Sequence, residues 1–159
     1  KDIVEIFIDK DGKVFLAMDD EGKKEIIAKA LNDTRNLGLD VNAFKKAQFF
    51  GASFASLASF LKLPEDQRKG NLLPGIPIQD TANNELVTWM ALVRDAYQGQ
   101  KPNLLLKGDN MAKYPAFKRV VDAFKKNEFL KFQLVTNPEN VPEGTDLWKK
   151  AQSGEKRED

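Results

Sequence analysis

The chain has 159 residues, which is about the length of one domain. Its 25 lysines and arginines almost balance its 24 aspartates and glutamates, and the net charge of +1 argues against a dedicated nucleic-acid-binding protein. Cysteine and histidine are absent, which excludes disulfides, thiol nucleophiles, Cys/His zinc sites and any catalytic triad with histidine as its base. We therefore expect a globular domain without metal or cofactor that is not an enzyme, since an enzyme of this composition would need a carboxylate or lysine mechanism.

The longest uncharged stretch, residues 47–61, is shorter than the roughly 20 apolar residues that a membrane helix needs. Because the chain begins at Lys1 rather than at methionine, we expect it to be a fragment of a longer protein. The absence of a signal or anchor segment in it therefore does not indicate the cytosol.

A β-hairpin is predicted at the start of the chain. Residues 2–8 and 13–18 are rich in strand-forming residues, and Asp9-Lys10-Asp11-Gly12 separates them. Gly12 is suited to the positive φ of such a turn. The two aspartates also resemble the opening of a calcium loop, but the glycine comes two positions early and the closing glutamate is missing, so the turn is favoured.

Helical periodicity follows from Lys23 to Leu63, with the acidic run at 19–21 as the expected helix entry. The first helix is expected to end at Gly38 and to bury one face, made of Ile26, Ile27, Ala30, Leu31 and Thr34. A second helix, capped by Asn42, carries Phe44, Ala47 and Phe50. A third, capped by Ser53, carries Phe54, Leu57, Phe60 and Leu61, and Pro64 opens a short helical turn through Gln67.

We expect residues 23–78 to form a helical subdomain that rests on the rest of the fold. Five phenylalanines in this stretch would otherwise leave much apolar surface in water. Residues 70–80 form an apolar Pro/Gly connection that is expected to lie against the core.

The C-terminal half alternates helices and strands. A helix capped by Asp80 or Thr81 is predicted to bury Leu86, Trp89, Met90, Val93 and Tyr97, and Gly99 and Pro102 end it. Residues 103–107 form a buried strand that ends at Gly108-Asp109. A helix then starts at Pro115, and residues 131–136 form the last strand. The composition of residues 138–159 predicts a poorly ordered tail.

The order of these segments resembles the periplasmic domain of the ExbD/TolR family of biopolymer transport proteins. The resemblance is carried by Asn103–Asp109 (a strand with an acidic end), Tyr114, the Val-Val-Asp-Ala-Phe run at 120–124, and the closing strand Lys131–Thr136. The Asp/Gly hairpin near the start fits the family's opening strands. The chain departs from the family by the long segment 23–78, and Gly108 stands where the family usually has alanine before the aspartate.

The resemblance implies a periplasmic domain of a single-pass inner-membrane protein, with a preceding membrane helix that works inside an ExbB-like channel subunit. It further implies a homodimer that uses the proton-motive force to drive a TonB-like protein, and thereby transport across the outer membrane. A TolR-like role in the Tol-Pal system or in engaging peptidoglycan is the alternative within the family. A carboxylate-dependent enzyme or a solute-binding domain is the alternative outside it.

We expect an α+β fold: a two-layer domain with a small mixed β-sheet and two helices on one face, plus an inserted α-helical subdomain. Residues 1–22 and 79–137 form the ExbD/TolR-like domain, 23–78 the insertion and 138–159 the tail. The last strand is the expected partner-binding element, with Phe132 and Leu134 on one face and Leu134 as the residue to change first. The expected partner-binding residues are Leu130, Phe132, Leu134, Val135, Asp109 and Tyr114. The alternative for Leu134 is a place in the core. The alternative for Asp109 is that it closes a turn, and for Tyr114 that it covers the edge of the core.

Overall fold

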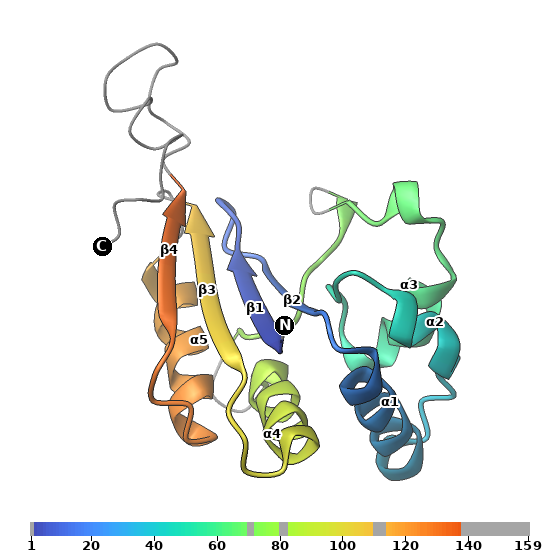
Figure 1. The fold of residues 1–159 in the computed structure, drawn as a ribbon. Helices are drawn as coiled ribbons and strands as arrows, with labels where there is room; N and C mark the ends of the chain where they lie inside the picture. Colours follow the sequence, from blue (N-terminus) through green and yellow to red (C-terminus); the bar gives the residue numbers. More distant parts are fainter. Residues whose placement is uncertain (1, 70–71, 80–82, 110–113, 138–159) are drawn as a thin grey trace.

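The structure, a computed structural model, describes residues 2–69, 72–79, 83–109 and 114–137 (Figure 1). One layer is a four-stranded sheet in the order β2-β1-β3-β4. β1 runs antiparallel to β2 and parallel to β3, and β3 runs parallel to β4. The strands are β1 (Ile3–Ile8), β2 (Val14–Met18), β3 (Asn103–Asp109) and β4 (Gln133–Asn137). The predicted α+β class with a small mixed sheet is confirmed.

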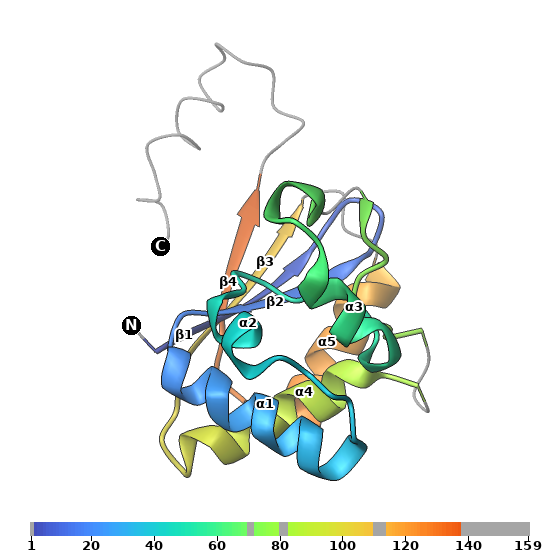
Figure 2. The same ribbon diagram turned by 90° about the vertical axis from the view of Figure 1, so that its right-hand side faces the viewer.

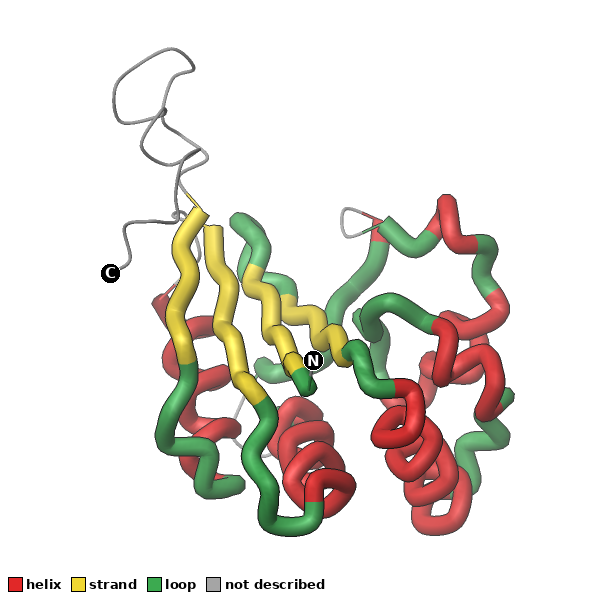
Figure 3. The backbone as a smooth tube through the Cα atoms, in the orientation of Figure 1, coloured by secondary structure: helices red, strands yellow, loops and turns green. Residues whose placement is uncertain are grey.

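Two helices, α4 (Glu85–Tyr97) and α5 (Tyr114–Lys126), cover one face of this sheet, as Figure 3 shows. Successive strand residues alternate between the faces, and those on the covered face form the core. Ile6 and Leu106 are fully buried there, as are Met90 of α4 and Phe124 of α5. The two-layer arrangement therefore places the opposite face of the sheet away from both helices.

The predicted turn between β1 and β2 is present. Gly12 has a φ of +83°, and its N–H donates to the carbonyl of Asp9 at 2.9 Å. The Asp9 side chain accepts from the main-chain N–H groups of Asp11 (2.9 Å) and Lys13 (2.8 Å). The Asp9 carboxylate is thus hydrogen-bonded within the turn, as the hairpin interpretation requires.

The start of α4 corrects the sequence analysis. The cap is neither Asp80 nor Thr81 but Asn84, whose Oδ1 accepts from the N–H of Leu86 at 3.0 Å. Asn84 Nδ2 also donates to the carbonyl of Arg119 in α5 at 3.2 Å. Asn84 therefore both caps α4 and contacts α5. The sequence around residue 80 does not reveal this second contact.

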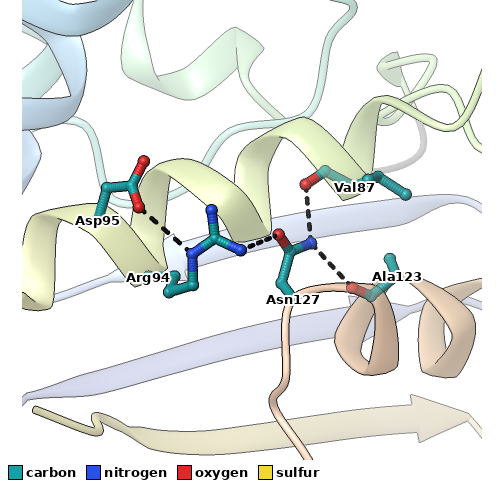
Figure 4. Close-up of polar contacts among 5 residues, drawn as sticks. All are labelled: Val87, Arg94, Asp95, Ala123 and Asn127. Atoms are coloured by element: carbon teal, nitrogen blue, oxygen red, sulfur yellow. Dashed lines mark hydrogen bonds and ion pairs between the residues drawn. The ribbon is translucent and has the colours of Figure 1, made fainter. Parts of the chain in front are cut away.

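Asn127, which follows α5, ties this helix to α4 (Figure 4). Its side chain is buried, and its Nδ2 donates to the carbonyls of Val87 and Ala123, each at 3.0 Å. Its Oδ1 accepts from Nη1 of Arg94 at 3.1 Å. All the polar atoms of this buried amide side chain are hydrogen-bonded, so it fixes the two helices against each other.

Helix α1 (Glu21–Arg35) starts at the acidic run as expected, with Asp20 as its N-cap. Its end differs, because Asn36 rather than Gly38 takes the left-handed conformation that stops the helix. Gly38 also has a positive φ but lies beyond the cap.

The buried face of α1 is rotated from the predicted one. Ile27 and Leu31 are buried as expected, whereas Ile26 and Thr34 are exposed. Lys24 is buried instead, and its Nζ donates to the carbonyl of Ala47 at 3.0 Å. Lys24 therefore joins α1 to the segment after the next helix.

Helix α2 (Val41–Lys46) is shorter than predicted, and its cap is Asp40 rather than Asn42. Phe44 lies in the helix and is buried, but Ala47 is its C-cap and Phe50 lies outside it. Phe50 instead forms an isolated antiparallel bridge with Leu16 of β2.

The next turns follow the prediction closely. Ser53 caps the short 3-10 helix η1 (Phe54–Ser56), its Oγ accepting from the N–H of Ser56 at 3.3 Å. The segment continues as α3 (Leu57–Lys62) and η2 (Glu65–Gln67). Figure 2 shows α1, α2 and α3 together on the side of the molecule where β2 lies.

A stack of aromatic rings joins these helices to α4. The centroids of Phe44 and Phe50 are 4.4 Å apart, those of Phe50 and Trp89 5.1 Å, and those of Phe54 and Trp89 5.5 Å. The connection before α4 also reaches the core, since Leu73 and Ile76 are buried. Phenylalanines from residues 44–54 and the sheet-covering helix α4 thus share one apolar interior.

Candidate functional site

The two edges of the sheet differ. On β2, Phe50 exchanges two hydrogen bonds with Leu16 (3.0 and 2.7 Å), and Ile76 N–H donates to the carbonyl of Val14 at 2.8 Å. On the other edge, β4 has β3 on one side and no strand on the other among the described residues. Its outer main-chain groups are therefore open to a further strand.

Exposed apolar side chains gather along this edge. Leu130 is 74% exposed, Leu134 51% and Val135 36%. Leu134 is in register with Leu106, on the helix-covered face, yet it remains half exposed because no strand of the described ranges lies beyond β4. The alternative that Leu134 belongs to the core is therefore wrong.

Phe132 behaves differently from the prediction. The last strand starts at Gln133, not at Lys131, so Phe132 lies before it. Its half-buried ring packs edge-on against Phe124 of α5, with centroids 5.1 Å apart. Phe132 therefore anchors the connection between α5 and β4, and it packs on the helix-covered side of the sheet, the side on which Leu134 also lies.

A groove of about 890 Å³ lies at the beginning of β4, between the chain that enters β3 and the chain that leaves α5. Among the residues that line it are Lys101, Leu105, Phe129, Leu130, Lys131 and Phe132. Leu130 and Phe132 are predicted from the sequence, whereas Lys101 and Phe129, which lie on opposite walls, are not. The Phe-Leu pair just after α5 is the one local signal that could have pointed to this wall.

The other two predicted residues lie elsewhere. Asp109 is the last residue of β3, in register with Asn137, and Tyr114 is the first residue of α5. Both main-chain positions are at the end of the sheet opposite the groove. The strand reaches Asp109 rather than stopping at Lys107, and the two side chains lie outside the described part of the structure. The six predicted residues therefore do not form one cluster.

Perturbed pKa values occur away from β4. Burial lowers the pKa of Lys24 from its usual value, although Glu21, Asp19 and Asp20 act in the opposite direction. Burial raises the pKa of Tyr97 to about 12, with smaller contributions from Asp2, Asp20 and Asp19.

Hydrogen bonds from Lys29 and Lys45 lower the pKa of Glu25. None of these three groups lines the β4 groove.

Within the described ranges, no three acidic, cysteine or histidine side chains are placed to hold a metal ion. Across the same ranges, no helix combines the length and apolarity needed to cross a membrane. Comparisons with protein-family models, with curated proteins and with solved structures find no match.

Proposed function

We propose that this chain is the periplasmic interaction domain of a proton-motive-force-driven complex similar to ExbB–ExbD–TonB, and that β4 is its partner-binding strand. Support comes from the sequence resemblance over residues 2–18 and 81–137. The observation that carries the proposal is the β4 edge, which has no strand partner among the described residues and carries the exposed Leu134 and Val135.

An extended peptide that pairs with β4 gains main-chain hydrogen bonds, which supply affinity without depending on sequence. Leu134 and Val135 project to opposite faces, so contacts with them would set the register of the incoming strand. The domain thus acts by binding and transmitting force, with no covalent chemistry of its own.

In this proposal the homodimeric domain follows a membrane helix that contacts an ExbB-like channel subunit. Proton flow through that channel changes how the domain presents β4 to the TonB-like protein. The segment 23–78 has no counterpart in the family pattern, and the Phe50 bridge gives it one role here. It occupies the β2 edge, so that within the described part of the chain β4 is the edge without a pairing partner.

Leu134→Gln tests the proposal, because it alters an exposed side chain of β4 while leaving the buried core intact. The measurement is titration calorimetry with the periplasmic segment of a TonB-like protein from the same organism, alongside thermal melting. We expect the variant to bind at least about tenfold more weakly, a loss of about 1.4 kcal/mol, with an unchanged melting temperature.

Ile26→Gln is the matched control, since Ile26 is an exposed aliphatic residue on α1, and it should bind like the parent chain. Failure of the parent chain to bind this segment would overturn the assignment of the partner. Equal binding by the Leu134→Gln variant would overturn the role of β4.

A further inference from the structure

The groove at the beginning of β4 has apolar walls. Phe129 is buried, Phe132 is half-buried, and Leu130 is 74% exposed. Leu105 lines it from β3, on the sheet face that points away from the covering helices, because alternate residues of a strand face opposite sides. The predicted tail, residues 138–159, lies outside the described residues, and the groove is lined by described residues alone. A hollow of about 890 Å³ with this lining has room for a bulky apolar side chain.

The charged side chains of the groove are predominantly basic. Lys101 and Lys131 line it and are exposed, against one lining carboxylate, that of Glu128. Lys101 Nζ lies 3.5 Å from the main-chain oxygen of Glu128, a neutral acceptor, so this contact leaves its positive charge available. Lys125 and Lys126 add two exposed cations in the last turn of α5. The groove therefore carries a net positive charge at its rim.

A second hollow, of about 480 Å³, adjoins the groove and shares Lys101, Glu128 and Phe129 with it. Its other charged side chains are Arg94 and Asp95, which pair with each other at 3.3 Å. This pair adds no net charge, so the positive excess at the groove is retained. An occupant that carries carboxylates beside a bulky apolar side chain complements both the charge and the walls of the groove.

Glu128 stands at a position where glycine is the usual residue. Its φ of +66° lies in the left-handed region that ends many helices. Its N–H donates to the carbonyl of Lys125 at 3.0 Å, and the N–H of Phe129 donates to the carbonyl of Phe124 at 2.9 Å. The end of α5 thus places one carboxylate among the groove lysines, and this carboxylate opposes the binding of an acidic occupant.

We propose that this groove selects the partner strand by its chemistry. An extended segment that pairs with β4 places a bulky apolar side chain against Phe129, Leu130 and Phe132, and an adjacent carboxylate near Lys101 and Lys131. The inference rests on the proposed function, because it takes β4 as the pairing strand. Main-chain pairing is indifferent to sequence, so the groove supplies the specificity, and like charges disfavour a segment with lysine or arginine at this position.

Three synthetic peptides test this preference on the full chain. They share one strand-forming core, and each end carries a tryptophan beside two residues that are Glu, Gln or Lys. Because both ends carry the motif, either strand direction brings it to the groove. Methyl NMR signals of Leu130 and Leu134 report on the groove and the strand separately. We expect the acidic peptide to bind at least about tenfold more tightly than the basic one at low salt, and the affinities to converge in about 0.5 M salt.

Charge variants of the protein sharpen the test. Lys101→Gln should weaken binding of the acidic peptide by about threefold, whereas Glu128→Gln should strengthen it by a similar factor. Lys29→Gln is the matched control, because it removes an exposed lysine on α1 and changes the net charge by the same amount as Lys101→Gln. It should bind the acidic peptide like the parent chain.

Equal affinities for the three peptides, or no binding by any of them, would overturn the inference. If Leu134→Gln weakened three equally bound peptides alike, the proposed role of β4 would stand, so the two failures are distinguishable. Changes in the Leu130 signal on diluting the peptide-free chain would show that a second copy occupies the groove, and they would overturn the inference as well.

Discussion

Phe50 and Leu16 pair as in an antiparallel sheet although 34 positions separate them: Leu16 N–H donates to the Phe50 carbonyl at 3.0 Å, and Phe50 N–H to the Leu16 carbonyl at 2.7 Å. This bridge brings Gly51 against the ring of Phe15, where a Cβ would lie 2.4 Å from Phe15 Cδ1. The close approach of the helical segment to β2 therefore depends on the absence of a side chain at residue 51.

Gly51→Ala should destabilise the fold by about 1–3 kcal/mol, because the buried Phe15 ring must move to admit the methyl group. Urea denaturation followed by circular dichroism measures the loss. Combining it with Phe15→Leu should cost less than the sum of the two single changes, since the smaller side chain gives the methyl group space. Additive losses would contradict the steric explanation.

Asn127→Ala should lower the free energy of unfolding by about 2–3 kcal/mol, because it removes the hydrogen bonds to Val87, Ala123 and Arg94 from a buried position. Asp95→Ala is the matched control. It removes the exposed ion pair with Arg94 (3.3 Å) and should cost less than about 0.5 kcal/mol. Similar losses for both variants in thermal or urea melts would show that the buried amide does not join α4 to α5.

The lowered pKa of buried Lys24 makes stability depend on pH. In the unfolded chain Lys24 keeps its proton up to about 10.5, whereas in the folded chain it releases the proton at lower pH. Its contribution to stability therefore rises as pH approaches 10.5 from below. Relative to Lys24→Met, which cannot titrate, the parent chain should gain stability over this range in urea melts. Parallel pH profiles of the two proteins would contradict this expectation.

Tyr97 should change the pH dependence of stability in the opposite direction. Its hydroxyl is buried without a hydrogen-bond partner in the described part of the chain, so Tyr97→Phe should be neutral or stabilising by up to about 1 kcal/mol at neutral pH. The folded pKa of about 12 exceeds the ordinary value of 10. The contribution of Tyr97 to the stability of the fold therefore falls as pH rises from 10 to 12. Tyr97→Phe should flatten the decline over that interval, and an unaltered decline in alkaline melts would contradict it.

The open β4 edge also predicts weak self-association, because two copies can pair along unpaired strands. Sedimentation equilibrium over a range of concentrations should detect a dimer that Leu134→Gln weakens. Leu72→Gln alters another exposed leucine and should leave association unchanged. A strict monomer, both alone and within the full membrane complex, would contradict the proposed dimer.

Local patterns predict the elements better than they predict the contacts. The β1–β2 hairpin, α4 and α5 follow from turn residues and periodicity, because those signals lie within a few positions. The bridge of Phe50 and the burial of Lys24 have no such signal, since their partners Leu16 and Ala47 are distant in sequence. At the site, the exposed Leu134 was identified, but the groove depends on how the chains before β3 and after α5 converge, which no local pattern encodes.

The position of β1 has a consequence for how the chain acquires its structure. β1 lies between β2 and β3, and its register with β3 pairs Ile3 with Asn103, one hundred residues later. The edge of β1 that faces β3 gains this neighbour only when residues 103–109 reach it. Closure of so long a loop is slow and favours late sheet assembly. A chain that has formed only the β1–β2 hairpin therefore exposes one edge of β1, and that edge is open to pairing with other chains until β3 docks.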